Sequence, residues 1–327
     1  MTLYATLRTA LLVVRDEREA PTVERRLADY DLECVCAHPD APDTVLVGTF
    51  DDGLFRSTDG ADSFERVAPE MESRVMSLAV NPHDPDEWWA GTEPSRVYHS
   101  TDAGVTWTEN PGLTDLPSAE DWYFPPRPDT HHIRWLAVDP SDTDHLYVGI
   151  EAGALVQSHD RGETWADRVD GSRRDNHSLA THPDAPERVW SAAGDGYAES
   201  HDHGETWDYP QEGLGHRYVW SVAVDPGDPE TVLVSAASGA RSAHSLPAES
   251  YVYRRDGDGA WEQAMDGLPE PDGLIRAVLE PGEDGECFAL TNRGVFRSTD
   301  FGGSWAALDV PWDESFESQT GRGLVAV

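Results

Sequence analysis

Short apolar runs alternate with turns rich in Pro and Asp along the whole chain. One unit reads "MSLAVNPHDPDEWWAGT" (76–92), and "RWLAVDPSDTDHLYVGI" (134–150) and "WSVAVDPGDPETVLVSA" (220–236) follow the same plan. Looser copies are "ECVCAHPDAPDTVLVGT" (33–49) and "HSLATHPDAPERVWSAA" (177–193). Pro and Asp favour tight turns, and apolar runs of this length are typical of strands. Each unit therefore predicts two strands joined by a turn.

An eight-residue box that ends in an aromatic residue follows each strand pair. The copies are "STDGADSF" (57–64), "STDAGVTW" (100–107), "SHDRGETW" (158–165), "SHDHGETW" (200–207), "RRDGDGAW" (254–261) and "STDFGGSW" (298–305). The closing aromatic residues are 43, 58, 42, 54 and 44 positions apart, so the unit has about 43 residues and two steps contain inserts. A third apolar run precedes the box and a fourth follows it, which makes four short strands per unit, the content of one propeller blade.

The repeat predicts an all-β chain that forms a single seven-bladed β-propeller of four-stranded antiparallel blades over residues 1–327. The blades are expected at 322–327 with 1–28, then 31–67, 74–109, 132–168, 175–209, 217–264 and 273–308. The first blade uses both ends of the chain because the C-terminal "GRGLVAV" is similar to the first strand "SRVMSLAV". Pairing of the C-terminal strand with the N-terminal segment would close the ring and remove exposed sheet edges. The inserts are expected at about 110–131 and 237–249.

The box has the chemistry of a turn. Its Ser and Asp side chains can bond nearby backbone amides, Gly can take a positive φ, and Trp can cover the hairpin. The pattern Ser-x-Asp-x-Gly-x-Thr-Trp resembles the Asp box of the BNR repeat family, which includes sialidases, sortilin-like receptors, some endoglucanases and photosystem II assembly factors. The resemblance implies a propeller in which the box is structural and lies outside the active site. The residues assigned this structural role are Ser57, Asp59, Ser100, Asp102, Gly104, Trp107, Ser158, Asp160, Gly162, Trp165, Ser200, Asp202, Gly204, Trp207, Asp256, Trp261, Ser298, Asp300, Gly302 and Trp305.

The chain is strongly acidic, with 62 Asp and Glu against 24 basic residues, all of them Arg, and a net charge of -38. A cationic partner such as calcium or a basic protein is one explanation, and a salt-rich solvent is the other. The acids are spread along the whole chain, which favours a salt-rich solvent as the explanation. This composition resembles that of cytosolic proteins of salt-accumulating haloarchaea. At molar salt the Debye length is about 3 Å, so we expect the melting temperature to rise with KCl concentration. Nucleic-acid binding is not expected because it needs a basic stripe.

Three cysteines, Cys34, Cys36 and Cys287, argue against a disulfide framework and suit a reducing compartment. No window approaches 18 apolar residues, so no membrane span is expected, and the N-terminus lacks a basic region before its apolar stretch. These features predict a cytoplasmic protein without contact to a membrane.

Several histidines could in principle bind a metal, with His131, His132 and His177 the better candidates. No spacing of the HExxH kind supports such a site. The expectation is therefore that the chain uses neither a metal nor a cofactor.

The first strand of a propeller blade is the innermost, and in sialidase-like families the face where the chain enters these strands holds the ligand site. Residues at or just before the first strands are therefore candidates for ligand binding: Arg74, His132, Arg134, His177, Arg217, Tyr218, Trp220 and Arg276. Such a lining suits an acidic small molecule, glycan or protein. The alternative is that the arginines neutralise the abundant acids around them.

The main functional interpretation is a monomeric, non-catalytic binding or scaffold module. A glycoside hydrolase of the sialidase-like class is the first alternative, and an assembly factor of the photosystem II type is the second. The resemblance to sialidases implies an Arg clamp, a Tyr–Glu pair and an acid, for which the candidates are Arg74, Arg134 and Arg276, then Tyr218 with Glu33 or Glu151, then Asp175 or Asp195. The Phe/Tyr-Arg-Ile-Pro signature of that class is absent. A carboxylate pair beside a Tyr in the central pocket would favour the hydrolase.

Overall fold

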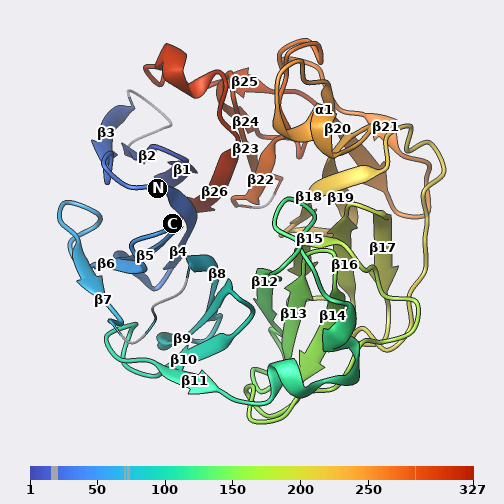
Figure 1. The fold of residues 1–327 in the computed structure, drawn as a ribbon. Coiled ribbons are helices and arrows are strands. Elements are labelled where there is room, and N and C mark those ends of the chain that lie inside the picture. Colours follow the sequence, from blue (N-terminus) through green and yellow to red (C-terminus); the bar gives the residue numbers. More distant parts are fainter. Residues whose placement is uncertain (16–20, 70, 72–73, 284) are drawn as a thin grey trace.

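The strands are arranged as a ring of seven blades around a central axis (Figure 1). The computed structural model describes residues 1–15, 21–69, 71, 74–283 and 285–327. Within these residues the chain forms seven antiparallel sheets, numbered here as blades 1 to 7. The predicted all-β, seven-bladed architecture is confirmed.

Blade 1 contains β26 (Gly321–Ala326), β1 (Thr2–Leu7), β2 (Ala10–Arg15) and β3 (Thr22–Arg26). Blade 2 contains β4 (Leu32–His38), β5 (Ala41–Thr49), β6 (Leu54–Ser57) and β7 (Glu65–Val67), and blade 3 contains β8 (Arg74–Asn81), β9 (Asp84–Glu93), β10 (Val97–Ser100) and β11 (Thr108–Asn110). Blade 4 contains β12 (Ile133–Val138), β13 (Leu146–Ile150) and β14 (Ala154–Ser158), and blade 5 contains β15 (Asn176–Thr181), β16 (Val189–Ala193) and β17 (Gly196–Ser200). Blade 6 contains β18 (Tyr218–Asp225), β19 (Asp228–Ala237), β20 (Ser250–Asp256) and β21 (Glu262–Gln263), and blade 7 contains β22 (Val278–Pro281), β23 (Cys287–Thr291), β24 (Gly294–Ser298) and β25 (Ala306–Ala307).

The fourth strand of blades 4 and 5 is reduced to a single bridge. Gln157 pairs with Ala166 in blade 4, and Glu199 pairs with Asp208 in blade 5. These bridges lie where the repeat predicts the fourth, outermost strand. The two blades therefore have the same arrangement as the others, with a shorter outer strand.

The two ends of the chain meet in blade 1, as predicted. Strand β26 pairs antiparallel with β1, with Leu3 opposite Ala326 and Ala5 opposite Leu324. The first strand of this blade therefore comes from the C-terminal end and the other three come from the N-terminal end (Figure 1). The pairing leaves no gap in the ring at which β1 would present an open edge.

Neighbouring blades pack face to face through apolar side chains. In β9, Trp88 and Trp89 are both fully buried but point to opposite faces, because side chains alternate along a strand. Trp88 lies in a cluster with Leu46 and Leu54 of blade 2, whereas Trp89 lies in a cluster with Leu136 of blade 4. Each side chain of this kind stabilises the fold by about 1.5–3 kcal/mol on burial, so both faces of a blade contribute to holding the ring together.

The boxes form the predicted turns between third and fourth strands. In the copy at 200–207, Ser200 Oγ donates to Asp202 Oδ1 at 2.8 Å, and the amide of Gly204 donates to Ser200 Oγ at 2.8 Å. Asp202 Oδ1 also accepts the Thr206 amide at 2.8 Å, and its Oδ2 accepts the Thr206 hydroxyl at 2.6 Å. The same four bonds recur in the boxes that begin at Ser57, Ser100, Ser158 and Ser298.

Every box also docks on the turn between the first two strands of its own blade. The amide at the fourth position of the box donates to a backbone carbonyl in that turn or at the start of the second strand, as His203 does to Glu187 at 2.8 Å. The degenerate box at 254–261 keeps this bond, from Gly257 to Glu230 at 2.9 Å, although Arg254 replaces the Ser. The box therefore links the outer and inner turns at one end of the ring, which we call the box face.

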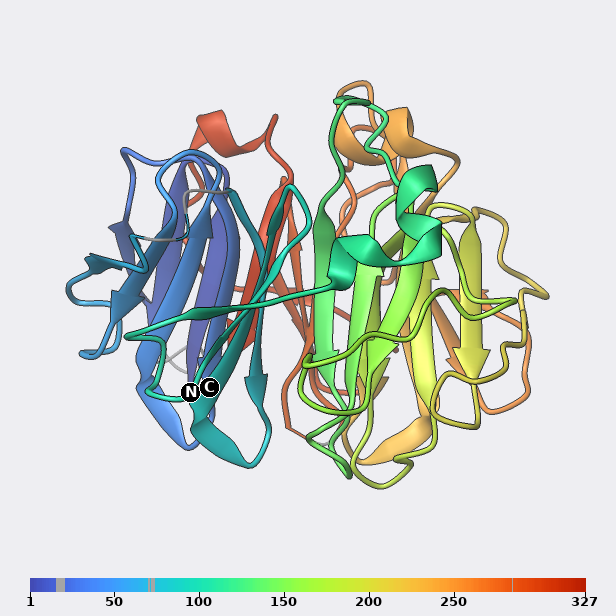
Figure 2. The ribbon, with the colours of Figure 1, turned by 60° about the horizontal axis from the view of Figure 1, so that its bottom comes forward.

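The two inserts rise from the opposite end of the ring (Figure 2). The first carries the short 3₁₀ helices η1 (Leu113–Asp115) and η2 (Pro117–Asp121), and the second carries α1 (Ala240–His244). A third 3₁₀ helix, η3 (Glu314–Phe316), precedes β26. Among the described residues, no helix has the length and apolar character needed to cross a membrane.

Candidate active site

The first strand of most blades bulges at one equivalent position. In six blades of the described structure, one residue of the first strand has no partner in the second strand. In blade 1 these two strands are β26 and β1. A bulge of this kind re-aims a side chain and is common beside functional sites. Blade 7 shows no such skip, but Arg276, two residues before the first paired residue Val278, lines the same cavity and is grouped with the six skipped residues. We call these seven residues the bulge ring: Glu33, Met76, Arg134, His177, Trp220, Arg276 and Arg322.

The bulge ring surrounds a cavity of about 620 Å³ at the end of the ring that carries the inserts, here called the pocket face. All members of the bulge ring except His177 line this cavity. Phe124 and Arg127 of the first insert and His244 of α1 complete its wall. The volume lies within the range of about 300–1,000 Å³ that is usual for pockets that bind small molecules.

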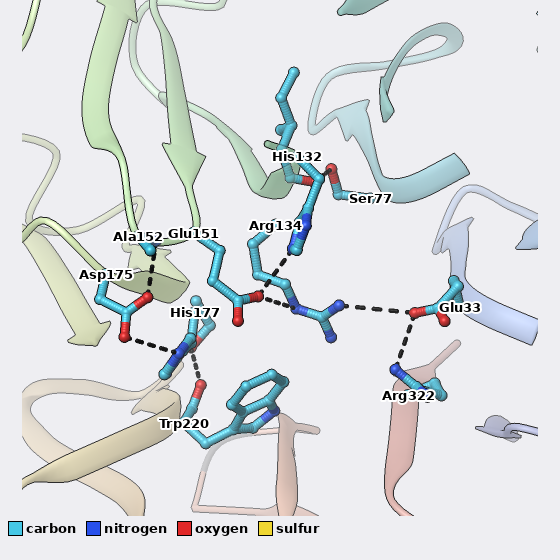
Figure 3. A network of polar contacts seen from close by, with 12 residues as sticks. Glu33, Ser77, His132, Arg134, Glu151, Ala152, Asp175, His177, Trp220 and Arg322 are labelled. Atoms are coloured by element: carbon cyan, nitrogen blue, oxygen red, sulfur yellow. Dashed lines mark hydrogen bonds and ion pairs between the residues drawn. The ribbon is translucent and has the colours of Figure 1, made fainter. Parts of the chain in front are cut away.

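Two carboxylates meet in this cavity, Glu151 directly after β13 and Asp175 directly before β15. One oxygen of each lies within 4.8 Å of the other and of a ring nitrogen of His177 (Figure 3). The Ala152 amide donates to Asp175 Oδ1 at 2.8 Å. A Cβ at Gly194 would come within 1.9 Å of Asp175 Oδ2, so a glycine is required there to leave space for the carboxylate.

The two carboxylates have opposite electrostatic surroundings. Burial raises the pKa of Asp175 above its usual value, and the neighbouring charge of Glu151 adds to the rise. Burial acts in the same direction on Glu151, but the charge of His132, its hydrogen bond of 2.9 Å, and the charges of His177 and Arg134 lower the pKa of Glu151 well below its usual value. The arrangement therefore favours a protonated Asp175 beside an ionised Glu151.

His132 helps to hold Glu151 in its charged form. Its Nε2 lies 2.9 Å from Glu151 Oε2, and its Nδ1 lies 3.4 Å from Glu93 Oε2. Although burial opposes it, the two carboxylates raise the pKa of His132. Glu93 also accepts two bonds from Arg127, at 2.7 and 2.5 Å, which fix the first insert to the end of β9.

Tyr218 stands beside the carboxylate pair as a neutral phenol. Burial and the charges of Glu151 and Asp175 raise the pKa of Tyr218 far above its usual value. Arg276 Nε donates to His244 Nδ1 at 3.2 Å, which places the ring proton on Nε2, 2.9 Å from the Tyr218 hydroxyl. Burial and the charge of Arg276 lower the pKa of His244 to about 2. The neutral His244 thus donates to Tyr218, whose own proton can point into the cavity.

The arginines of the bulge ring already have partners. Arg276 lies 3.5 Å from the centroid of the Trp220 ring and Arg134 lies 4.8 Å from it. Arg134 NH1 lies 3.8 Å from Glu33, and Arg322 donates to the same carboxylate at 3.0 Å (Figure 3). Pairing with acids and stacking on Trp220 therefore fix these guanidinium groups at the wall of the pocket.

The eight residues expected at the site fall into three groups. His132, Arg134, Tyr218, Trp220 and Arg276 line the cavity. His177 lies behind it, with its ring 4.4 Å from that of Trp220. Arg74 lies outside the cavity, paired with Glu93 at 2.8 Å over the Phe50 ring, and Arg217 is exposed and is not part of the lining.

Sequence reasoning missed Met76, Glu93 and Phe50 at this site. For Met76 a signal exists, because each member of the bulge ring directly precedes the apolar core of a first strand: "M-SLAV", "R-WLAV", "H-SLAT" and "W-SVAV" occupy one column of the repeat. Glu93 is the last residue of β9 and Phe50 directly follows β5, and neither carries such a mark.

No family profile matches the chain. Among curated proteins it is similar to an oligoxyloglucan-reducing end-specific xyloglucanase of Emericella nidulans, 32% identical over 89 residues, which are 27% of this chain and 10% of that protein. It is also similar to the xyloglucanase Xgh74A of Acetivibrio thermocellus, 25% identical over 166 residues, 42% of this chain and 19% of that protein. The chain thus spans less than a fifth of the length of these relatives.

Solved structures share the fold. An ancestral GH74 enzyme superposes with a TM-score of 0.67 at 16% identity over 87% of this chain and 39% of that chain. The GH74 enzyme of Niastella koreensis gives 0.66 at 18% identity over 88% and 47%. YCF48 bound to D1 peptide gives 0.58 at 17% identity over 86% and 82%.

These comparisons correct the main functional expectation from the sequence. A non-catalytic binding or scaffold module was expected, but the relatives and structural neighbours include glycoside hydrolases. The hydrolase alternative is better supported, although the similarity is to xyloglucanases and GH74 enzymes and gives no support to a sialidase-like activity.

Proposed function

We propose that this propeller is a glycoside hydrolase whose reaction takes place at Glu151 and Asp175 in the central cavity. The observation that carries the proposal is a pair of neighbouring carboxylates with opposite pKa shifts beside Tyr218. Glycosidases need one carboxylic acid to protonate the leaving oxygen and one carboxylate to act as nucleophile or base. The similarity to xyloglucanases supports the same reaction class.

Asp175 is the general acid in this proposal, because burial and the charge of Glu151 raise its pKa, whereas the pKa of Glu151 is lowered. Glu151 is the nucleophile, held ionised by His132. The oxygens of the two groups lie within 4.8 Å, and carboxyl groups only about 5–5.5 Å apart are typical of retaining enzymes. The proposal therefore includes retention of the anomeric configuration. A partly buried aromatic ring that can contact a sugar is present at Phe124 on the cavity wall.

The test measures release of reducing ends by the full chain from a panel of oligosaccharides that includes xyloglucan fragments. Asp175→Asn and Glu151→Gln should each lower the rate by a factor of about 10² or more. The matched control is Glu163→Gln, which changes an exposed carboxylate of a box and should leave the rate unchanged. Activity equal to that of the parent in Glu151→Gln, or products of inverted configuration, would refute the assignment.

A peptide is a second candidate ligand for the same cavity. The structure is similar to YCF48 bound to D1 peptide over most of both chains, whereas the two GH74 enzymes compared above are matched over less than half of theirs. Fluorescence anisotropy with a labelled acidic peptide would test it. Saturable binding that Trp220→Ala abolishes would favour the peptide, and its absence in the parent would exclude this candidate.

A further inference from the structure

A cluster of three metal-ligating side chains lies on the box face, at the end of the ring away from the cavity. Asp139 follows β12 and His145 precedes β13 in blade 4, whereas His203 lies in the box of blade 5. Asp139 Oδ2 is 3.1 Å from His203 Nδ1 and 3.7 Å from His145 Nδ1. One ligand atom of each residue lies within 4.8 Å of the other two. The cluster therefore joins two neighbouring blades (Figure 1).

The tautomer of His145 is fixed by its other neighbour. Gln157 Nε2 donates to the Gly204 carbonyl at 3.1 Å, so Gln157 Oε1 is the atom that faces the histidine. His145 Nε2 lies 2.8 Å from this oxygen and must carry the proton. The lone pair of a neutral His145 is then on Nδ1 and points at the Asp139 carboxylate. Two acceptors face each other across 3.7 Å, and only a cation or a proton between them makes this arrangement favourable.

The carboxylate of Asp139 is held in the orientation that a ligand needs. Its Oδ1 accepts the Ser141 amide and hydroxyl, both at 2.8 Å, which turns Oδ2 towards the two histidines. The Asp139 side chain is fully buried, and Tyr147 donates to Oδ2 at 3.2 Å. Hydrogen bonds of this kind to metal ligands set their orientation and affinity.

We propose that Asp139 Oδ2, His145 Nδ1 and His203 Nδ1 bind a divalent transition-metal ion of the zinc type. Ligands about 2.0–2.2 Å from zinc in a tetrahedron lie roughly 3.3–3.5 Å from one another, and the distances of 3.1 and 3.7 Å bracket this range. Two imidazoles and one carboxylate select zinc, copper or nickel over magnesium or calcium, which prefer oxygen ligands. The fourth position faces solvent, since the His203 side chain is 45% exposed.

The site is structural, because it ties the box of blade 5 to the inner turn of blade 4. This role is independent of the proposed hydrolase reaction. Metal binding should raise the melting temperature, since an ion that binds the folded chain stabilises it by mass action.

The experiment uses the untagged full chain, treated with EDTA, dialysed and titrated with ZnCl₂ in a calorimeter. The parent should bind one Zn²⁺ per cluster with an accompanying rise in melting temperature. His203→Asn should bind at least tenfold more weakly and lose the thermal shift, and because His203 is partly exposed the variant should still fold, as circular dichroism would verify. His201→Asn is the matched control, since His201 lies in the same box but pairs with Glu199 at 3.5 Å.

Equal Zn²⁺ affinity in the parent and in His203→Asn would overturn the proposal. It would place any bound metal elsewhere, for instance at Glu151, Asp175 and His177, whose ligand atoms also lie within 4.8 Å of one another. Failure of the parent to bind Zn²⁺ at 100-micromolar concentration would equally overturn it, because a proton would then occupy the space between Asp139 and His145.

Discussion

Two positions recur from blade to blade, the box between the third and fourth strands and the bulge in the first strand. At the box both the side chains and their hydrogen bonds repeat. The bond from the Ser hydroxyl to the Asp carboxylate measures 2.7 Å in the copy at Ser57 and 2.8 Å in the copy at Ser298. At the bulge the backbone repeats but the side chain does not. Glu, Met, His, Trp and two Arg occupy the six skipped places, and Arg276 of blade 7 lies beside them at the cavity.

The difference follows from what each position must do. A box closes a hairpin, and every hairpin needs the same amide and carboxylate partners. The bulge residues share one cavity, in which a site needs acids, cations and apolar surface at different points. In this chain, repetition therefore marks the scaffold, and variation at a repeated position marks the candidate site.

Replacement of Arg134 by Met tests the bulge side of this comparison and should have the largest effect. The charge of Arg134 is one of those that lower the pKa of Glu151, so its loss should raise that pKa. The acidic limb of the pH–rate profile should therefore move to higher pH, and kcat/KM measured on that limb should fall. Removal of one partner of a buried ion pair can cost about 3–5 kcal/mol. The loss of stability should be smaller here, because Arg322 still donates to Glu33 and His132 still contacts Glu151.

Arg96→Met is the control for this variant. Arg96 pairs with Glu109 on the outer strands and should affect neither the profile nor the rate. A large loss of stability in Arg134→Met without a shift of the profile would show that the bulge ring belongs to the scaffold.

Replacement of Asp202 by Ala tests the box side. The carboxylate accepts bonds from the Ser200 hydroxyl and from the amide and hydroxyl of Thr206, each of which contributes about 1 kcal/mol. We expect a loss of about 2–4 kcal/mol in the free energy of unfolding, measured by urea titration. Activity per folded molecule should be unchanged. Glu205→Ala, an exposed neighbour in the same box, should cost less than about 0.5 kcal/mol.

The box aspartates also predict a pH range in which the fold weakens. Hydrogen bonds from Ser63, with further bonds from Ser57, lower the pKa of Asp59 to about 2. The pKa values of Asp102, Asp160, Asp202 and Asp300 are lowered as well. Because these pKa values are lower in the folded chain than in the unfolded chain, the ionised box aspartates stabilise the fold. Their contribution is complete above the unfolded pKa near 4 and is lost as the pH falls towards 2. The melting temperature should fall as the pH is lowered from 5 to 2. A melting temperature that does not change over this range would contradict this assignment.

The smallest effect on stability is expected in the box at 57–64, where Ala61 stands at the position that glycine occupies in the other intact boxes. Ala61 has φ 69°, whereas Gly104 occupies the same box position with φ 79°. Ala61→Gly would relieve about 1 kcal/mol of left-handed strain and lose about 0.8 kcal/mol of methyl burial, so stability should change by less than about 0.5 kcal/mol. Gly104→Ala should cost about 1–3 kcal/mol, because its Cβ would lie 2.7 Å from Leu46. Calorimetric melting of both variants would show whether the two boxes differ in this way.

The blades could be predicted from the sequence because each box carries its own signal. Ser, Asp, Gly and Trp act within eight residues, so the spacing of the aromatic ends was sufficient to place six blades, and the similarity of the C-terminal segment to a first strand placed the seventh. The carboxylate pair could be named only as one of several options, since Glu151 and Asp175 come from different blades and an acidic chain offers many candidates. The same limit applies to Asp139 and His203, whose meeting depends on how blade 5 packs against blade 4. His244 lies in an insert, where no repeat indicates its neighbours.

The pairing of β26 with β1 can form only after nearly the whole chain has been synthesised. Leu3 is synthesised more than 300 residues before its partner Ala326. At ribosomal rates this interval is on the order of tens of seconds. During it the edge of β1 can pair with other chains, and closure then requires a contact between the most distant parts of the sequence, which slows folding. The ring that protects its edges once complete is thus most exposed to misassembly while it is being made.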